Sequence, residues 1–343
     1  MYERNSLSTP IRWGVIGCGD VLERKSGPAF HRSERSRIGA VASSDGESAT
    51  RYAAAHDVPV ATGDAEQVIT DPEIDAVYVA SPPNTHEGFT VAAAEAGKPV
   101  LVEKPMGRSL TEGREMIDAC DRAGVELFVA YYRRFHPHVE EIQKLLAEGR
   151  IGEPVSAIVN HAFPRPNDSG WRETPEISGG GWFVDATSHR VDLLCHLLGA
   201  PTEATGVVRC DDGDSRTETA VSLSLAVADG ICCTVTSDFV GAGSTDRFVI
   251  RGTAGSIVAE TLDSGGFTYE VAGESGSVAC NQPESTHGGL LDHVEAVLLD
   301  GETNRSTGRD AIQTEAILDN CVRSAYADAI PTTVWDGSFP LTD

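Results

Sequence analysis

Three side chains that can exchange a proton stand out in this chain of 343 residues: Lys104, Asp185 and His189. Lys104 follows the apolar run "VLVE" and precedes a proline, in a chain whose only lysines are at positions 25, 98, 104 and 144. A buried amine near other positive charge can lose its proton, whereas a guanidinium cannot. The sequence therefore predicts an acid–base role for Lys104, with a solvated surface lysine as the alternative.

Asp185 and His189 lie four residues apart in "GGGWFVDATSHRVDLLCHLLG", so they share one face of a predicted helix. A carboxylate that orients an imidazole is a common arrangement for acid–base catalysis. A surface pair and a metal site are the alternatives. No third cluster of strong ligands is evident, and we expect no metal.

A glycine turn near the N-terminus indicates a dinucleotide cofactor. Gly17 and Gly19 follow an apolar strand and open a helix, where the backbone can approach a pyrophosphate. Leu22 takes the place of the third glycine of the usual motif, so a purely structural turn is the alternative.

The second predicted strand ends without the acid that binds the ribose of NAD. Ser43 stands there, followed by Ser44 and Asp45. The missing acid leaves room for a 2′-phosphate and favours NADP over NAD, although Asp45 could turn toward a ribose. Ser44 with Glu47 also forms an S-x-x-E capping box, so that serine could be structural.

The stretch "ASPPNTHEGF" follows a later strand and offers polar side chains at the edge where ligands bind in such sheets. A plain turn with a helix cap is the alternative. Together with the glycine turn and the end of the Lys104 strand, the expected cofactor contacts are Gly17, Gly19, Asp20, Val21, Ser43, Ser44, Ser81, Pro82, Asn84, His86 and Lys104.

Alternating strand and helix patterns over residues 1–130 predict a parallel α/β sheet that binds a nucleotide. Longer alternating strands follow in residues 131–343 and predict an α+β domain on a large open, mostly antiparallel sheet. A helix across residues 309–329 closes this pattern and is a candidate for returning to the first domain.

The composition excludes several classes of partner. Acidic residues outnumber basic ones 52 to 27, for a net charge of −25, and no basic stripe offsets the repulsion of nucleic acid or anionic lipid. No apolar run is long enough to cross a membrane and no signal-peptide core is present, so we expect a cytoplasmic protein. The dispersed acids suggest a halophilic source.

The motifs "GVIGCGD", "SPPNTH", "EKP" and "GGGWFVDATSH" resemble, in order, those of the oxidoreductases named for glucose-fructose oxidoreductase, inositol 2-dehydrogenase and MocA. Further stretches resemble the branch near 1,5-anhydrofructose reductase. The resemblance implies a Rossmann domain, then an open sheet that forms the substrate wall and often the contact of a dimer or tetramer. It implies that Lys104 and His189 are catalytic, that Asp185 orients the histidine, and that Glu103 and the loop 81–86 contact the cofactor. It also implies that Pro105 follows a cis peptide.

We therefore expect NAD(P)-dependent hydride transfer to or from a carbinol or carbonyl carbon of a sugar, polyol or related cyclic compound. A nucleotide-binding sensor or transcription co-regulator without catalysis, and an NAD-dependent glycosidase, are the alternatives. Many relatives carry asparagine where this chain has Tyr132, so the identity of the substrate stays open. The expected substrate contacts are Tyr132, Arg134, Trp171, Arg172, Asp185 and His189. For all of them except Asp185 and His189, a packing role is the alternative.

Overall fold

The structure, a computed structural model, describes residues 9–166, 170–210 and 217–323. Their contacts divide the chain into two compact units. Of these described residues, the first unit contains 9–107, 111–132 and 284–311, and the second contains 108–110, 133–166, 170–210, 217–283 and 312–323. Residues 131–343 were expected to form one domain, with the helix at 309–329 as a candidate for returning to the first, whereas the returning segment is residues 284–311.

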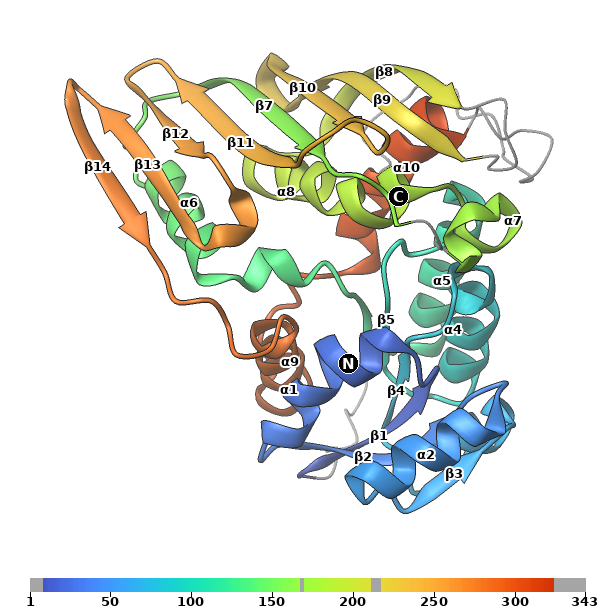
Figure 1. Cartoon of the computed structure of the whole chain (residues 1–343). Coiled ribbons are helices and arrows are strands. Elements are labelled where there is room, and N and C mark those ends of the chain that lie inside the picture. The colour runs from blue at the N-terminus through green and yellow to red at the C-terminus, as the bar shows by residue number, and fades with distance from the viewer. Residues whose placement is uncertain (1–8, 167–169, 211–216, 324–343) are drawn as a thin grey trace. The chain divides into compact units, whose positions relative to one another are not determined.

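A six-stranded parallel sheet forms the centre of the first unit, and it confirms the predicted Rossmann sheet (Figure 1). The strand order is β3-β2-β1-β4-β5-β6. The chain adds β2 and β3 on one side of β1 and then β4 to β6 on the other, so the order of addition reverses between β1 and β4. Ligands of such sheets bind outside the carboxyl ends of the strands at this reversal. The strands are β1 (Ile11–Ile16), β2 (Ser36–Ala42), β3 (Val60–Thr62), β4 (Ala76–Val79), β5 (Val100–Val102) and β6 (Leu127–Val129).

The helices of the first unit fill the connections between these strands, and α9 joins them from a distant part of the sequence. In Figure 1, α9 lies beside α1, and the contacts between these two helices agree. The helices are α1 (Gly27–Arg32), α2 (Gly46–His56), α3 (Ala65–Thr70), α4 (His86–Glu95), α5 (Leu110–Ala123) and α9 (Gly288–Glu295).

An eight-stranded sheet forms the second unit, in the order β14-β13-β12-β11-β7-β10-β9-β8. Only the β7–β10 pair is parallel, which confirms a mostly antiparallel sheet. The strands are β7 (Pro154–Ala162), β8 (Pro201–Cys210), β9 (Glu218–Val227), β10 (Ile231–Asp238), β11 (Thr245–Gly252), β12 (Gly255–Ala259), β13 (Gly266–Val271) and β14 (Glu274–Ala279).

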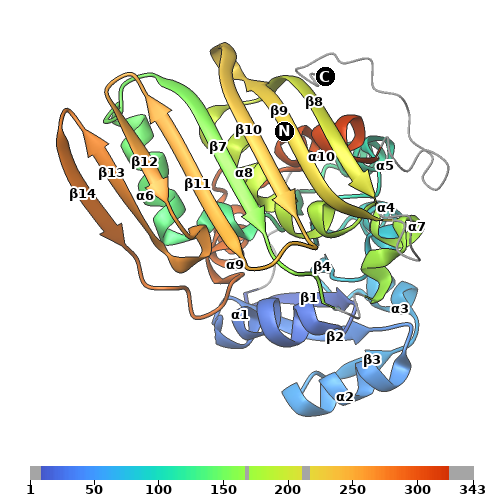
Figure 2. The same cartoon turned by 45° about the horizontal axis from the view of Figure 1, so that its top comes forward.

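The helices of the second unit lie on one face of this sheet, and the strands are seen without a helix over them in the turned view (Figure 2). The covered face holds the core of the unit, which includes Val159, Leu194, Leu223, Val235 and Phe248. The helices are α6 (Pro137–Ala147), α7 (Pro175–Ser178), α8 (Ser188–Leu198) and α10 (Gly308–Cys321). Residues 324–329 of the predicted last helix lie outside the described residues.

Three π-helical turns adjoin helices in the described part of the chain: η1 (Leu22–Ser26), η5 (Phe183–Thr187) and η8 (Ala296–Asp300). The first runs directly into α1 and the second into α8. In η1, the N–H of Gly27 donates to the carbonyl of Leu22, and a Cβ on this glycine would lie 2.2 Å from that oxygen. The turn that carries Leu22 therefore requires a glycine at position 27.

Candidate active site

The glycine turn of the first unit has the geometry that a dinucleotide needs. Gly17 has φ of +109°, and a Cβ there would lie 2.6 Å from the backbone of Ala80, so only glycine fits. A Cβ on Gly19 would meet nothing within 4 Å, which leaves this side of the turn open. Helical residues follow directly from Asp20, and backbone N–H groups at such a start bind phosphate.

The end of β2 departs from the predicted capping box. Asp45, not Ser44, is the N-cap of α2, because its carboxylate accepts from the backbone N–H of Glu47 at 3.2 Å. The hydroxyl of Ser48 also donates to Asp45, and this contact lowers the pKa of the Asp45 carboxyl. Ser43 and Ser44 are left partly and fully exposed at the strand end.

His86 supports the loop after β4 and has no surface with which to contact a cofactor. Its side chain is 0% exposed, with Nε2 2.8 Å from the carbonyl oxygen of Ser81 and Nδ1 3.0 Å from that of Pro105. Burial lowers the pKa of His86, although both carbonyl oxygens oppose this shift. The structure therefore gives His86 a structural role in place of the expected cofactor contact. Ser81 and Pro82 are partly exposed and Asn84 is exposed, and all three stay predicted cofactor contacts.

Lys104 follows the carboxyl end of β5 and is half-buried. Its backbone N–H donates to the carboxylate of Glu103 at 3.3 Å, and the peptide to Pro105 is cis, as the resemblance implied. Parallel strands place their carboxyl ends at one edge, so Lys104 shares that edge with the glycine turn and with Ser43.

Glu103 is a buried anion held by several donors. The hydroxyl of Tyr78 lies 2.7 Å from its Oε1 and Nε2 of His287 lies 2.8 Å from the same oxygen. Burial alone would raise the pKa of Glu103, but the charge and hydrogen bond of His287, the charge of Lys104 and the Tyr78 bond lower it to about 2. The carboxylate is therefore ionised beside the lysine.

The second unit contains the other predicted catalytic pair. Asp185 accepts a hydrogen bond from Nε of Arg172 at 2.7 Å, and His189 is 3% exposed on α8. The Arg172 guanidinium lies over the indole rings of Trp171 and Trp182, at 4.4 Å and 5.3 Å from their centroids. This stacking fixes the arginine that in turn holds the Asp185 carboxylate.

Glu218, which the sequence analysis missed, holds the start of the segment that carries Asp185. Its side chain is 0% exposed and lies at the beginning of β9. The carboxylate accepts from the N–H groups of Gly181 and Phe183 at 2.8 Å and 2.7 Å, and from Val184 at 3.4 Å. A negative charge at these N–H groups complements the helix dipole of the segment that carries Asp185.

Arg134 is occupied by a structural contact. Its guanidinium is 3% exposed and donates through two nitrogens to the carboxylate of Asp192 on α8. Of the two roles left open by the sequence, the contacts therefore support packing over substrate binding. Tyr132 is 5% exposed and lies against the His287 ring at 4.5 Å between centroids.

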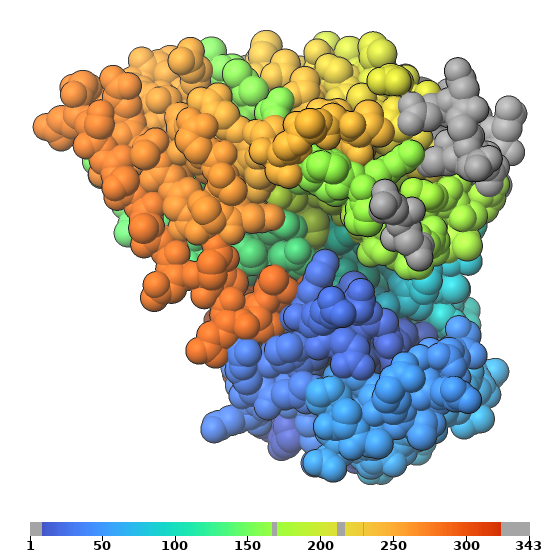
Figure 3. All heavy atoms as spheres, in the orientation of Figure 1, coloured from blue at the N-terminus to red at the C-terminus, as the bar shows by residue number. Residues whose placement is uncertain are grey.

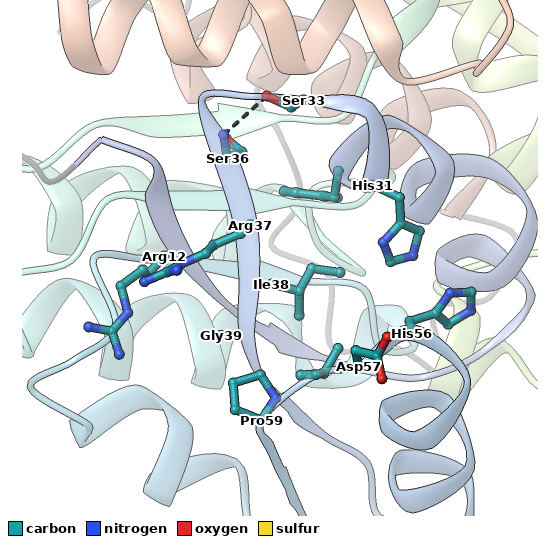
Figure 4. Close-up of a pocket in the computed structure, with 12 residues that line it drawn as sticks. Arg12, His31, Ser33, Ser36, Arg37, Ile38, Gly39, His56, Asp57 and Pro59 are labelled. Carbon is teal, nitrogen blue, oxygen red and sulfur yellow. Dashed lines mark hydrogen bonds between the residues drawn. The ribbon is translucent and has the colours of Figure 1, made fainter.

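A depression of about 440 Å³ in the first unit lies away from these residues (Figure 4). Arg12 and Arg37 lie to one side of β2 and His31 and His56 to the other. The depression adjoins Ser36 to Gly39, at the amino-terminal half of the strand, whereas Ser43 follows the carboxyl end. It is therefore separate from the predicted cofactor edge.

The described residues contain neither a metal-binding cluster nor a helix suited to a membrane. Among residues 9–166, 170–210 and 217–323, no three His, Cys, Asp or Glu side chains are grouped so that they could hold a metal ion. Within the same residues, no helix combines the length and the apolar character that crossing a membrane requires.

The ionised state of Glu103 predicts an acid-sensitive contribution to stability. Its folded pKa of about 2 lies below the ordinary 4.5, so the unfolded chain binds the extra proton first. The contribution is full above pH 4.5 and is lost as the pH falls toward 2. Its size is roughly 3 kcal/mol.

We expect the free energy of unfolding of the wild type to fall more steeply than that of Glu103→Gln over this pH range. Urea unfolding at successive pH values measures the difference. Glu260→Gln removes a carboxylate that is 70% exposed and serves as the control, which should follow the wild type. Parallel curves for wild type and Glu103→Gln would contradict an ionised Glu103.

Comparisons with known proteins agree with the motifs and the fold. Residues 11–131 match the model of an oxidoreductase family with an NAD-binding Rossmann fold, GFO_IDH_MocA, and residues 139–258 match the GFO/IDH/MocA C-terminal domain. The 1,5-anhydro-D-fructose reductase of Ensifer adhaerens is 32% identical, over 73% of this chain and 76% of that protein. D-xylose 1-dehydrogenase (NADP(+)) 2 of Haloferax volcanii is 31% identical, over 67% and 70% respectively.

A solved structure extends the similarity over nearly the whole chain. The aldose-aldose oxidoreductase of Caulobacter crescentus, complexed with glycerol, superposes with a TM-score of 0.83 and is 26% identical. The match covers 93% of this chain and 97% of that one. The chain is therefore a member of the Gfo/Idh/MocA family of NAD(P)-binding oxidoreductases.

Proposed function

We propose that the chain transfers a hydride, reversibly, between a nicotinamide cofactor and a carbinol or carbonyl carbon of a sugar, polyol or related cyclic compound. The observation that carries this proposal is the half-buried Lys104 beside an ionised carboxylate at the cofactor edge of the Rossmann sheet. When bound, the nicotinamide supplies or accepts the hydride. The residues of the chain bind, orient and move the proton of the reacting hydroxyl.

Lys104 and His189 share the proton chemistry in this proposal. During oxidation, either the imidazole of His189 takes up the hydroxyl proton while the ammonium of Lys104 polarises the substrate oxygen, or the neutral amine of Lys104 itself takes up the proton. Asp185 orients the imidazole, and Arg172 holds the carboxylate of Asp185 at 2.7 Å. Charged groups held in place before the reaction stabilise the transition state without reorganisation.

A sugar or polyol fits the side chains near Asp185. Trp171 and Trp182 present indole rings and Arg172 a guanidinium, and none of the three is fully buried. Aromatic faces pack against C–H groups while charged groups bind hydroxyls. The names of the relatives, a 1,5-anhydro-D-fructose reductase and a D-xylose dehydrogenase, support a substrate of this class.

Replacing Lys104 with methionine tests the central step. We expect turnover to fall by at least about a hundredfold, the lower end for general acid–base catalysis. The dissociation constant of the cofactor should stay within a few-fold, because the glycine turn is untouched. A screen of sugars and polyols, read by absorbance at 340 nm with either cofactor, supplies the substrate.

Lys144→Met removes an exposed lysine of α6 and is the matched control. Its turnover should equal that of the wild type. A Lys104→Met enzyme with wild-type turnover would remove this lysine from the mechanism.

We propose NADP as the preferred cofactor. The end of β2 carries Ser43 and exposed Ser44, and the carboxylate of Asp45 caps α2. Arg51 donates to the hydroxyl of Ser48 at 2.8 Å, and its charge acts on Cys18 in the glycine turn. A serine end with an arginine nearby suits a 2′-phosphate, while an acid there would suit a free ribose hydroxyl. The NADP(+) in the name of the Haloferax volcanii relative supports this preference.

Two substitutions test the cofactor preference. Ser43→Asp places a carboxylate at the strand end and should raise the KM for NADP+ by at least about tenfold, because like charges repel. Arg51→Gln should raise the same KM while leaving that for NAD+ nearly unchanged. Arg32→Gln, at the far end of α1, is the control. A wild type with equal KM values for both cofactors would reject the preference.

We propose that the uncovered face of the eight-stranded sheet joins copies of this chain into a dimer or tetramer. The cross-strand row formed by Ser224, Thr234, Ile158, Val249 and Val258 is uncharged. Ile158 is 42% exposed, and strands β10 to β14 lie at the surface in the space-filling view (Figure 3). An uncharged row on the uncovered face of a sheet, in a chain of net charge −25, supports association between copies.

Charge on this face should separate the copies. Ile158→Glu and Thr234→Glu are expected to convert the oligomer into a monomer, measured by light scattering after size-exclusion chromatography. Val60→Glu makes the same kind of change on β3, where the side chain is 43% exposed, and should keep the oligomer. A wild type that is monomeric at high concentration would refute the proposal.

A further inference from the structure

Glu103 needs its hydrogen-bond donors because it is 6% exposed and ionised. A buried carboxylate without donors is strongly unfavourable. One donor, Tyr78, comes from β4 at 2.7 Å, and the other, His287, comes from a segment 184 residues along the chain at 2.8 Å. Both bond to Oε1, which leaves Oε2 toward the backbone N–H of Lys104 at 3.3 Å.

His287 is itself firmly held. It is the N-cap residue of α9, and its carbonyl accepts from the N–H of Leu291 at 2.9 Å. The side chain is 3% exposed, and its ring lies 4.5 Å from that of Tyr132, between centroids. Its Nδ1 lies 3.2 Å from the hydroxyl of Thr286, so Nε2 can carry the hydrogen that Glu103 accepts.

The segment that carries His287 is fixed to the first unit on its other side. The hydroxyl of Ser285 donates to the carbonyl of Lys25 at 2.8 Å, and that of Ser33 donates to Glu295 at the end of α9. A rigid segment of this kind transmits its position to the carboxylate that it contacts. In this arrangement, His287 serves as a hydrogen-bond donor and does not itself carry out a chemical step.

We propose that His287 is a positioning residue for the reaction: it fixes the carboxylate of Glu103 and thereby the direction in which Lys104 presents its amine. This inference rests on the proposed function for the task of Lys104. Without His287, the carboxylate keeps Tyr78 alone on Oε1 and can rotate to pair with the ammonium. The lysine would then be drawn toward its neighbour and away from the substrate.

The scarcity of lysine provides a direct spectroscopic test. Protein labelled with carbon-13 at the ε-carbon of lysine should give four signals, and the one missing in Lys104→Met belongs to Lys104. In cofactor-free protein, we expect His287→Leu to shift that signal and to leave those of Lys98 and Lys144 in place. His287→Gln retains an N–H donor at a similar reach, so the Lys104 signal of this variant should lie close to that of the wild type.

Kinetics supply the second readout. We expect His287→Leu to lower kcat about tenfold, with the KM for the cofactor within about twofold, because the amine is misdirected while the glycine turn is intact. His287→Gln should recover most of the loss, and it also tests the proposal if His287→Leu does not fold. The matched control is His293→Leu, which removes another buried histidine of α9, one that accepts from the N–H of Arg305 at 2.9 Å.

His293→Leu should leave both the Lys104 signal and kcat unchanged. The proposal is overturned if the Lys104 signal keeps its wild-type position in His287→Leu, if kcat is unchanged there, or if His293→Leu moves the signal equally. The spectroscopic comparison needs no substrate. A wild type inactive on every sugar would therefore count against the proposed function, while a signal shift confined to position 287 would still show that His287 sets the placement of Lys104.

Discussion

The buried negative charge of Glu103 constrains the edge of the first unit at which the cofactor is expected. Taking a carboxylate out of water costs several kcal/mol unless donors replace the water. The donors come from β4 and from the turn before α9, while the charge itself stands at the end of β5. Three segments must therefore meet at one point before the charge is tolerated. The same contacts position the backbone of Lys104, the residue that follows Glu103.

Glu218 is a second buried carboxylate whose lost water must be replaced by donors, and it lies in the second unit. This carboxylate is also fully buried, and backbone N–H groups at the start of a helical segment replace its water. The held element carries Asp185, whose own carboxylate is fixed by an arginine between two indoles. In both units, a buried acid holds the backbone beside a residue for which we propose a role in the reaction.

Local patterns in the sequence were sufficient for the fold and for the positions of several predicted site residues on it. Strand–turn–helix alternation predicts a Rossmann sheet, and the parallel order brings the glycine turn, Ser43 and Lys104 to one edge as expected. The i, i+4 spacing of Asp185 and His189 identified the helical segment of the second unit. These features depend on residues close together in the chain or on the regular geometry of a sheet.

The contacts that no local pattern predicts are those between distant segments. His287 lies in a polar turn, and its sequence neighbourhood gives no sign of a carboxylate 184 residues earlier. Glu218 opens an ordinary alternating strand, so only its complete burial shows that it holds another element. The roles of Ser44 and His86 were assigned from local spacing alone. Asp45 displaced the first as the helix cap, and burial against two carbonyl oxygens displaced the second from the ligand surface.

The π-helical turns at Leu22–Ser26 and Phe183–Thr187 have a consequence for how this chain is aligned with its relatives. Such a turn accommodates one residue more than an α-helical turn of the same length would, and each α-helical residue rotates the chain by about 100°. A gap of one position placed across either stretch therefore corresponds to a real change of phase between the two sides of the helix. A homologue that is one residue shorter in either turn would point the side chains that follow the turn in a different direction. This would hold even if every flanking residue were identical.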